Sequence, residues 1–161
     1  IDVSGSMSGK PSEIASLFGS ILAKSNNCDV MTFSTKANYV NWNPLDSLLS
    51  LRNSFRFSGG GTNFPSIFQT ANKKYDRILI LSDMQGWMGH NCPSKEFNDY
   101  KNRFNCDPYV YSWDLQGLGT LQFPENKVFG LSGFSEKVFD IISLLEEDKK
   151  ALFNRINSIS L

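Results

Sequence analysis

The chain has 161 residues, which is enough for one domain with a full hydrophobic core. Its 16 basic residues balance its 16 acidic residues, so the overall charge gives no attraction toward nucleic acids or membranes, and no apolar run is long enough to span a bilayer. The three cysteines are an odd number, which favours free thiols in a reducing compartment, so we expect a cytoplasmic protein.

Predicted strands and helices alternate along the chain, which indicates an α/β domain. The segment 11–24 carries apolar residues at helical spacing, and the run 78–81 is continuously apolar, as is typical of a central parallel strand. In chain order we expect a strand end at 1–3, helix 11–24, strands 28–33 and 38–42, a short helix at 45–51, helix 64–71, strand 77–81, helix 94–105, strands 108–113 and 128–131, and helical segments at 135–145 and 152–159.

The short turn at 34–36 suits a hairpin between the second and third expected strands. We therefore predict a doubly wound, mostly parallel central sheet with one antiparallel edge strand and helices on both faces. Residues 1–161 form a single domain in this interpretation. Only one residue precedes Asp2, so we expect the start of the first strand and any upstream domain to lie outside this chain.

Three polar clusters stand where predicted elements end. Asp2, Ser4 and Ser6 form the pattern D-x-S-x-S in a glycine-containing turn after the first strand. Thr62 follows three consecutive glycines, and Asp83 follows a buried strand. The carboxyl ends of parallel strands face one crevice, in which open α/β sheets bind ligands. Because Mg²⁺ prefers oxygen ligands and few direct carboxylates, these five side chains are candidate metal ligands.

This set of residues resembles the metal-ion-dependent adhesion site of von Willebrand factor A domains, and the resemblance extends over nearly the whole chain. The stretches 110–115 and 131–135 further resemble the A domain at the C-terminal end of Ro (TROVE-type) ribonucleoproteins and their bacterial and phage relatives. The resemblance implies a Rossmann-like fold. It also implies metal-dependent protein binding without catalysis.

The resemblance assigns a role to each candidate ligand of Mg²⁺ or Mn²⁺. Ser4 and Ser6 would bind the ion directly, and Asp2, Asp83 and Thr62 would bind it directly or through water. An open coordination position would then capture an acidic side chain from a protein partner. Whole TROVE-type proteins bind small noncoding RNA through a ring of helical repeats, which would lie upstream of this chain.

Two other functions remain open alternatives. In the first, the domain is an accessory RNA-contacting surface of a ribonucleoprotein, although its sequence has no basic stripe or RNA-binding motif. In the second, it is a Mg²⁺-dependent hydrolase that uses Asp2 and Asp83. Each of the five side chains also has an ordinary structural interpretation, as a helix cap or a hydrogen-bonding group in a turn.

The cysteines and the loop around Trp87 leave smaller questions. His90, Cys92 and Cys106 are a zinc alternative that has no evident fourth ligand and no CxxC pair, so we expect free thiols. We expect Cys28 to be a buried thiol in a strand. The Trp87 loop either forms a contact surface or folds its aromatic side chain back onto the domain.

Overall fold

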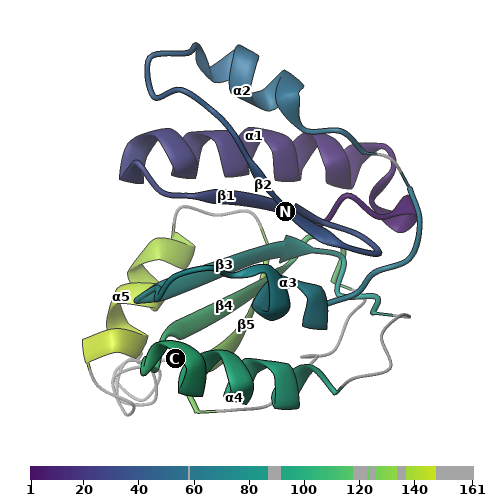
Figure 1. Cartoon of the computed structure of the whole chain (residues 1–161). Coiled ribbons are helices and arrows are strands. Elements are labelled where there is room, and N and C mark those ends of the chain that lie inside the picture. The colour runs from purple at the N-terminus through teal and green to yellow at the C-terminus, as the bar shows by residue number, and fades with distance from the viewer. Residues whose placement is uncertain (58, 87–91, 118–122, 124–125, 134–136, 148–161) are drawn as a thin grey trace, which may run out of the picture.

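In the computed structural model of this chain, the described residues are 1–57, 59–86, 92–117, 123, 126–133 and 137–147. They form strands flanked by helices, as the sequence predicts (Figure 1). In chain order the elements are a 3₁₀ turn (Gly5–Met7), α1 (Lys10–Asn26), β1 (Val30–Phe33), β2 (Ala37–Val40), α2 (Leu48–Ser54), α3 (Pro65–Thr70), β3 (Arg77–Ser82), α4 (Pro93–Phe104), β4 (Tyr109–Asp114), β5 (Val128–Ser132) and α5 (Lys137–Glu147).

The strands form two ladders. β3, β4 and β5 are parallel neighbours in that order, and β1 pairs with β2 in antiparallel fashion. The predicted hairpin and its antiparallel edge strand are therefore confirmed. The α/β fold class with a mostly parallel sheet is confirmed as well.

Residues 1–3 join the two ladders into one sheet. Asp2 forms a parallel bridge with Phe33 of β1, and its backbone N–H donates to Leu81 O of β3 at 2.9 Å. The spatial order is therefore β2, β1, 1–3, β3, β4, β5. This is the 3-2-1-4-5-6 order of doubly wound sheets, in which the connections reverse direction between the first strand and its neighbour. That reversal lies between residues 1–3 and β3, so Asp2 stands at the position where such sheets bind ligands.

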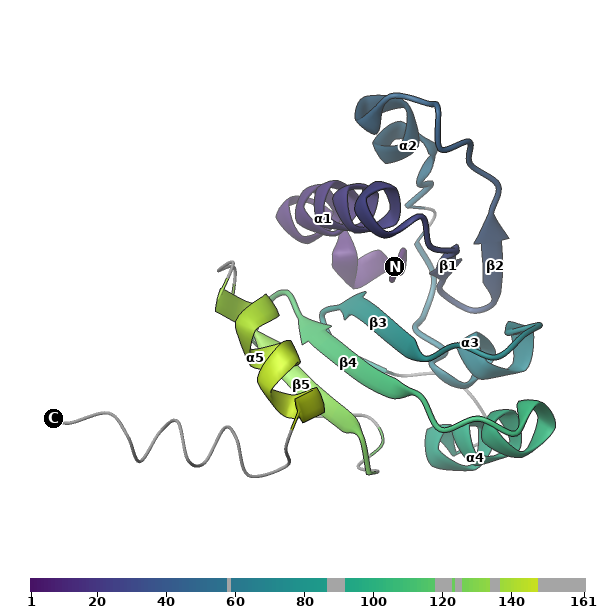
Figure 2. The same ribbon diagram turned by 90° about the vertical axis from the view of Figure 1, so that its left-hand side faces the viewer.

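Helices cover both faces of the sheet (Figure 2). α1 and α5 lie on one face and pack on alternate side chains of β4, among them Tyr111 and Trp113. α3 and α4 lie on the other face, where Phe68, Phe97 and Val110 belong to one buried cluster. The alternation of β4 side chains between two apolar clusters follows from the two-residue period of a strand.

Element ends differ from the predicted ones for local reasons. α1 ends as expected, because Asn27 adopts a left-handed conformation with φ 46° that stops the helix. α2 begins at Leu48 rather than near residue 45, because the Ser47 side chain accepts a hydrogen bond from Ser50 N at 3.1 Å and caps the helix. β1 begins at Val30, so the expectation that Cys28 is a buried strand residue is wrong and its side chain is exposed.

The expected helical segment 152–159 lies outside the described residues. No described helix is both long enough and apolar enough to cross a membrane.

Candidate functional site

Asp2 lies at the carboxyl end of the strand position between β1 and β3, and its side chain is fully buried. Its Oδ1 accepts a hydrogen bond from Ser4 N at 2.9 Å, and its Oδ2 accepts one from the Ser82 hydroxyl at 2.6 Å. Burial raises the pKa of Asp2, the hydrogen bonds from Ser82 and Ser4 oppose this change, and the charge of Asp83 raises the pKa further. The carboxyls of Asp2 and Asp83 therefore lie near enough for their charges to interact.

Ser4 and Ser6 flank the first residue of the 3₁₀ turn. Their hydroxyl oxygens are 3.2 Å apart, and Ser4 is buried whereas Ser6 is exposed. Met7 is fully buried among residues of α1 and β4, which fixes the turn to the core. Gln116 Nε2 also donates to the Ser6 carbonyl at 3.3 Å. The two hydroxyls are thus held side by side at the edge of the domain.

Thr62 lies on the loop between α2 and α3, and its side chain is buried. The Gly5 amide donates to Gly60 O at 3.0 Å, which joins this loop to the turn that carries Ser4 and Ser6. The next residue, Asn63, donates from its backbone to Ser34 O at 2.8 Å and so ties the loop to the end of β1. The loop is therefore held on two sides.

Asp83 follows β3 directly and is fully buried. Its Oδ1 accepts a hydrogen bond from Gln85 N at 3.2 Å. Its Oδ2 is also buried, and it has no hydrogen-bond partner among the described residues. A buried carboxylate oxygen without a partner is costly, which makes this atom the most unusual polar group of the site.

Asp2, Ser4, Ser6 and Asp83 lie at the carboxyl ends of two neighbouring strands, and Thr62 lies on a loop that is hydrogen-bonded to the turn after the first of them. The side chains of Asp2, Ser4 and Ser6 belong to one hydrogen-bonded turn. Thr62 is joined to that turn through Gly60, two residues earlier in its loop, and Asp83 is joined to it through its direct neighbour Ser82. The hydroxyls and carboxyls are hard oxygen donors of the kind that Mg²⁺ takes.

Sequence reasoning missed two residues that hold the site together. Ser82 is the direct neighbour of Asp83, so its hydroxyl at a strand end was a visible signal. Gln116 gave no such signal, because it reaches Ser6 from a distant part of the sequence, the turn after β4. In that turn, Asp114 Oδ1 accepts hydrogen bonds from Gln116 N at 2.9 Å and from Gly117 N at 2.8 Å.

Within the described part of the chain, no group of three or more His, Cys, Asp or Glu side chains could hold a metal ion. A cation at this site would rely on hydroxyl oxygens beside two carboxyls. Cys92 and Cys106 form no disulfide in the described structure. His90 and residues 87–91 lie outside the described residues, so the zinc alternative and both interpretations of the Trp87 loop stay open.

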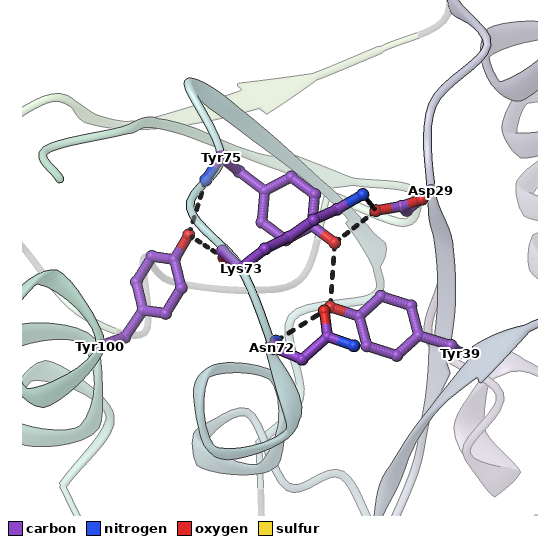
Figure 3. Close-up of polar contacts among 6 residues, drawn as sticks. All are labelled: Asp29, Tyr39, Asn72, Lys73, Tyr75 and Tyr100. Carbon is purple, nitrogen blue, oxygen red and sulfur yellow. Dashed lines mark hydrogen bonds and ion pairs between the residues drawn. The ribbon is translucent and has the colours of Figure 1, made fainter. Parts of the chain in front are cut away.

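A second group of polar residues lies at the opposite end of the sheet, before β1 and β3 (Figure 3). The Tyr75 hydroxyl donates to Asp29 Oδ2 at 2.5 Å, and Lys73 Nζ lies 2.6 Å from the same oxygen. The hydrogen bonds from Lys73 and Tyr75 lower the pKa of Asp29. This tyrosine cluster connects the hairpin to the start of β3, and it consists of Asp29, Tyr39, Asn72, Lys73, Tyr75 and Tyr100.

Comparison with protein-family models and with curated proteins finds no match to this chain. Among solved structures, the fold is similar to the crystal structure of the Deinococcus radiodurans Ro (RSR) protein, with a TM-score of 0.68 and 15% sequence identity. The similarity covers 88% of this chain and 32% of that protein, so the chain spans about a third of the length of its structural neighbour. At this identity the similarity shows the fold alone.

Proposed function

We propose that this chain is a domain for metal-dependent protein binding, in which Asp2, Ser4, Ser6, Thr62 and Asp83 hold Mg²⁺ or Mn²⁺. The observation that carries the proposal is the buried Asp83 Oδ2, which has no hydrogen-bond partner among the described residues and belongs to a carboxyl whose charge acts on Asp2. Two nearby carboxylates out of water repel each other, and a divalent cation offsets that repulsion.

The chemistry of the donor set supports a non-catalytic role. Bound Mg²⁺ would supply positive charge at the site. Three of its five candidate ligands are neutral hydroxyls and two are carboxylates, so part of that charge would stay available to a partner. Ser6 is the exposed member of the set, so a carboxylate from a partner protein would approach on its side. Catalysis by Asp2 has less support, because both of its oxygens already accept hydrogen bonds within the domain.

The test is calorimetric titration of Mg²⁺ and Mn²⁺ into the metal-stripped protein. We expect one saturable site in the wild type and at least tenfold weaker binding in Thr62→Val, which removes a hydroxyl and keeps the side-chain shape. Thr70→Val is the matched control, because it makes the same change on α3, where the hydroxyl bonds Ala37 O. Absence of metal binding by the folded wild type would overturn the proposal.

The partner chemistry needs a separate measurement. Acetyl-Gly-Glu-Gly-amide is the carboxylate probe and its Gln analogue is the control, both followed by amide chemical shifts. We expect the Glu peptide to shift the amides around Ser6 and Gly60 when Mg²⁺ is present, and to shift nothing in EDTA. Equal effects of the two peptides would contradict capture of a carboxylate.

RNA association is a second candidate, supported by the similarity of the fold to the Ro (RSR) protein. Three basic side chains of the described residues, Lys73, Arg77 and Lys127, each pair with an acid, which reduces the charge that they could offer to phosphates. Binding of a labelled RNA hairpin that weakens between about 50 and 200 mM salt would favour this candidate. No binding at the lower salt concentration would contradict it. We place either function in a reducing compartment, in keeping with the free thiols.

A further inference from the structure

The Ser82 hydroxyl both accepts and donates a hydrogen bond within the domain. It is the last residue of β3 and is fully buried. The Met84 amide donates to its Oγ at 2.9 Å, so this oxygen acts as an acceptor. Its single proton is then directed to Asp2 Oδ2, 2.6 Å away. The hydroxyl therefore links the Asp2 carboxyl to the backbone of Met84, the residue that follows Asp83.

The backbone around Ser82 leaves this side chain little freedom. Leu81 O accepts a hydrogen bond from Asp2 N at 2.9 Å on one side, and Ser82 O accepts one from Leu115 N at 2.9 Å on the other. Ser82 is also in register with Asp114 of β4. The strand is thus held on both edges at this residue, and the hydroxyl is held in place for Asp2.

The carboxyls of Asp2 and Asp83 differ in how many of their oxygens accept hydrogen bonds, and the Ser82 contact contributes to this difference. Both oxygens of Asp2 accept hydrogen bonds from the protein, one from Ser4 N and one from Ser82 Oγ. Asp83 keeps one buried oxygen that has no partner in the part of the chain that the structure describes. Asp2 therefore shapes the turn, whereas Asp83 leaves an oxygen that a metal ion could bind.

We propose that Ser82 is a positioning residue of the candidate metal site, whose hydroxyl holds the Asp2 carboxyl so that the turn from Asp2 to Ser6 keeps its two hydroxyls together. The metal part of this inference rests on the proposed function, and the effect on the turn does not. Without the hydroxyl, Asp2 Oδ2 would be a buried acceptor with no donor, and the Met84 amide would lose its acceptor. The carboxyl would then turn and release Ser4 N.

The test compares Ser82→Ala with Ser82→Thr, which keeps the hydroxyl. Ser112→Ala is a matched control, because Ser112 is a buried serine of the adjacent strand β4 whose hydroxyl has no hydrogen-bond partner in the described structure. We expect Ser82→Ala to weaken Mg²⁺ binding by roughly 10- to 100-fold, as the loss of a group that orients a metal ligand does. Ser82→Thr and Ser112→Ala should bind as the wild type does.

A second readout needs no metal. Amide hydrogen exchange of Ser4 in EDTA should be at least tenfold faster in Ser82→Ala than in the wild type, and unchanged in Ser112→Ala. If Ser82→Ala fails to fold, Ser82→Cys replaces it, because a thiol is a weak donor of similar size and should show the same changes in smaller degree.

The outcomes separate the two proposals. A wild type that binds no metal but whose Ser4 protection depends on the Ser82 hydroxyl would overturn the metal site and keep the positioning role. Wild-type affinity together with wild-type Ser4 protection in a folded Ser82→Ala protein would overturn the positioning role and keep the metal site. Loss of affinity in Ser82→Thr equal to that in Ser82→Ala would also overturn the role of the hydroxyl.

Discussion

The backbone amide of Gly5 donates a 3.0 Å hydrogen bond to the carbonyl of Gly60, and this contact joins the D-x-S-x-S turn to the loop that carries Thr62. Gly60 has φ +90°, a conformation that residues with a side chain rarely adopt, and a Cβ built there would lie 3.3 Å from Thr35 Cγ2. A glycine is therefore required where the two halves of the candidate site meet.

Replacing this glycine should disturb both stability and the site. We expect Gly60→Ala to lower the free energy of unfolding by about 1 kcal/mol through backbone strain, and to weaken Mg²⁺ binding as the loop shifts away from Gly5. Gly133→Ala is the control, because Gly133 has φ +89° just after β5 and a Cβ there would meet no atom of the described residues within 4 Å. Urea denaturation and calorimetry measure the two effects, and equal losses of Mg²⁺ affinity in both variants would contradict a specific role for the Gly5–Gly60 contact.

Asp83→Asn should weaken metal binding and at the same time stabilise the fold. The change keeps the shape of the side chain but removes a buried charge that acts on Asp2 and whose Oδ2 has no partner within the described residues. In EDTA we expect the free energy of unfolding to rise by about 1 kcal/mol, because the repulsion between the two carboxyls is lost. Mg²⁺ affinity should fall at least tenfold. Unchanged affinity in calorimetry would mean that Asp83 is not a ligand.

Glu146 should make stability depend on pH in the acid range. Its carboxylate accepts hydrogen bonds from Arg77 Nε at 2.5 Å, from the Arg77 Nη2 group and from the Tyr111 hydroxyl at 2.9 Å. The hydrogen bond from Arg77 is the main cause that lowers the pKa of Glu146 from 4.5. A lowered pKa in the folded state means that this stabilisation is present above the unfolded pKa and is lost as the pH falls through the folded one.

The measurement is the urea midpoint at about pH 6 and about pH 3 for the wild type and Glu146→Gln. We expect the wild type to be the more stable protein at the higher pH, and the difference to shrink at the lower pH. Asp99→Asn is the control, because Asp99 pairs with Lys95 on the exposed surface of α4 and should contribute little. A difference that does not change with pH would refute the role of the Glu146 charge.

Tyr75→Phe should weaken the fold and leave the candidate site intact. The change removes the hydroxyl that bonds Asp29 and lies 2.9 Å from the Tyr39 hydroxyl. We expect the free energy of unfolding to fall by about 1–2 kcal/mol, because a hydrogen bond to a charged group is lost. Mg²⁺ affinity should stay at the wild-type value, since the tyrosine cluster lies at the opposite end of the sheet. A parallel loss of affinity would show that the two ends are coupled.

Much of the architecture follows from local pattern. The apolar face of α1, the left-handed stop at Asn27 and the continuous apolar run of β3 are short-range features, and each predicted its element. The expectation for Cys28 failed because an apolar stretch does not indicate at which residue a strand begins to pair. The cap at Ser47 was missed for a similar reason, since several leucines before and after it suit a helix equally well.

The sequence by itself determined the residue types of the candidate site and their places at the ends of predicted elements. Only the tertiary structure decided that residues 1–3 insert between β1 and β3, which brings Ser82 to Asp2 and the charge of Asp83 to the same end of the sheet. It also decided that Gln116 reaches Ser6. The physical reason is that these contacts depend on the order of strands across the sheet, which is set by packing of both faces and not by any local pattern of residues.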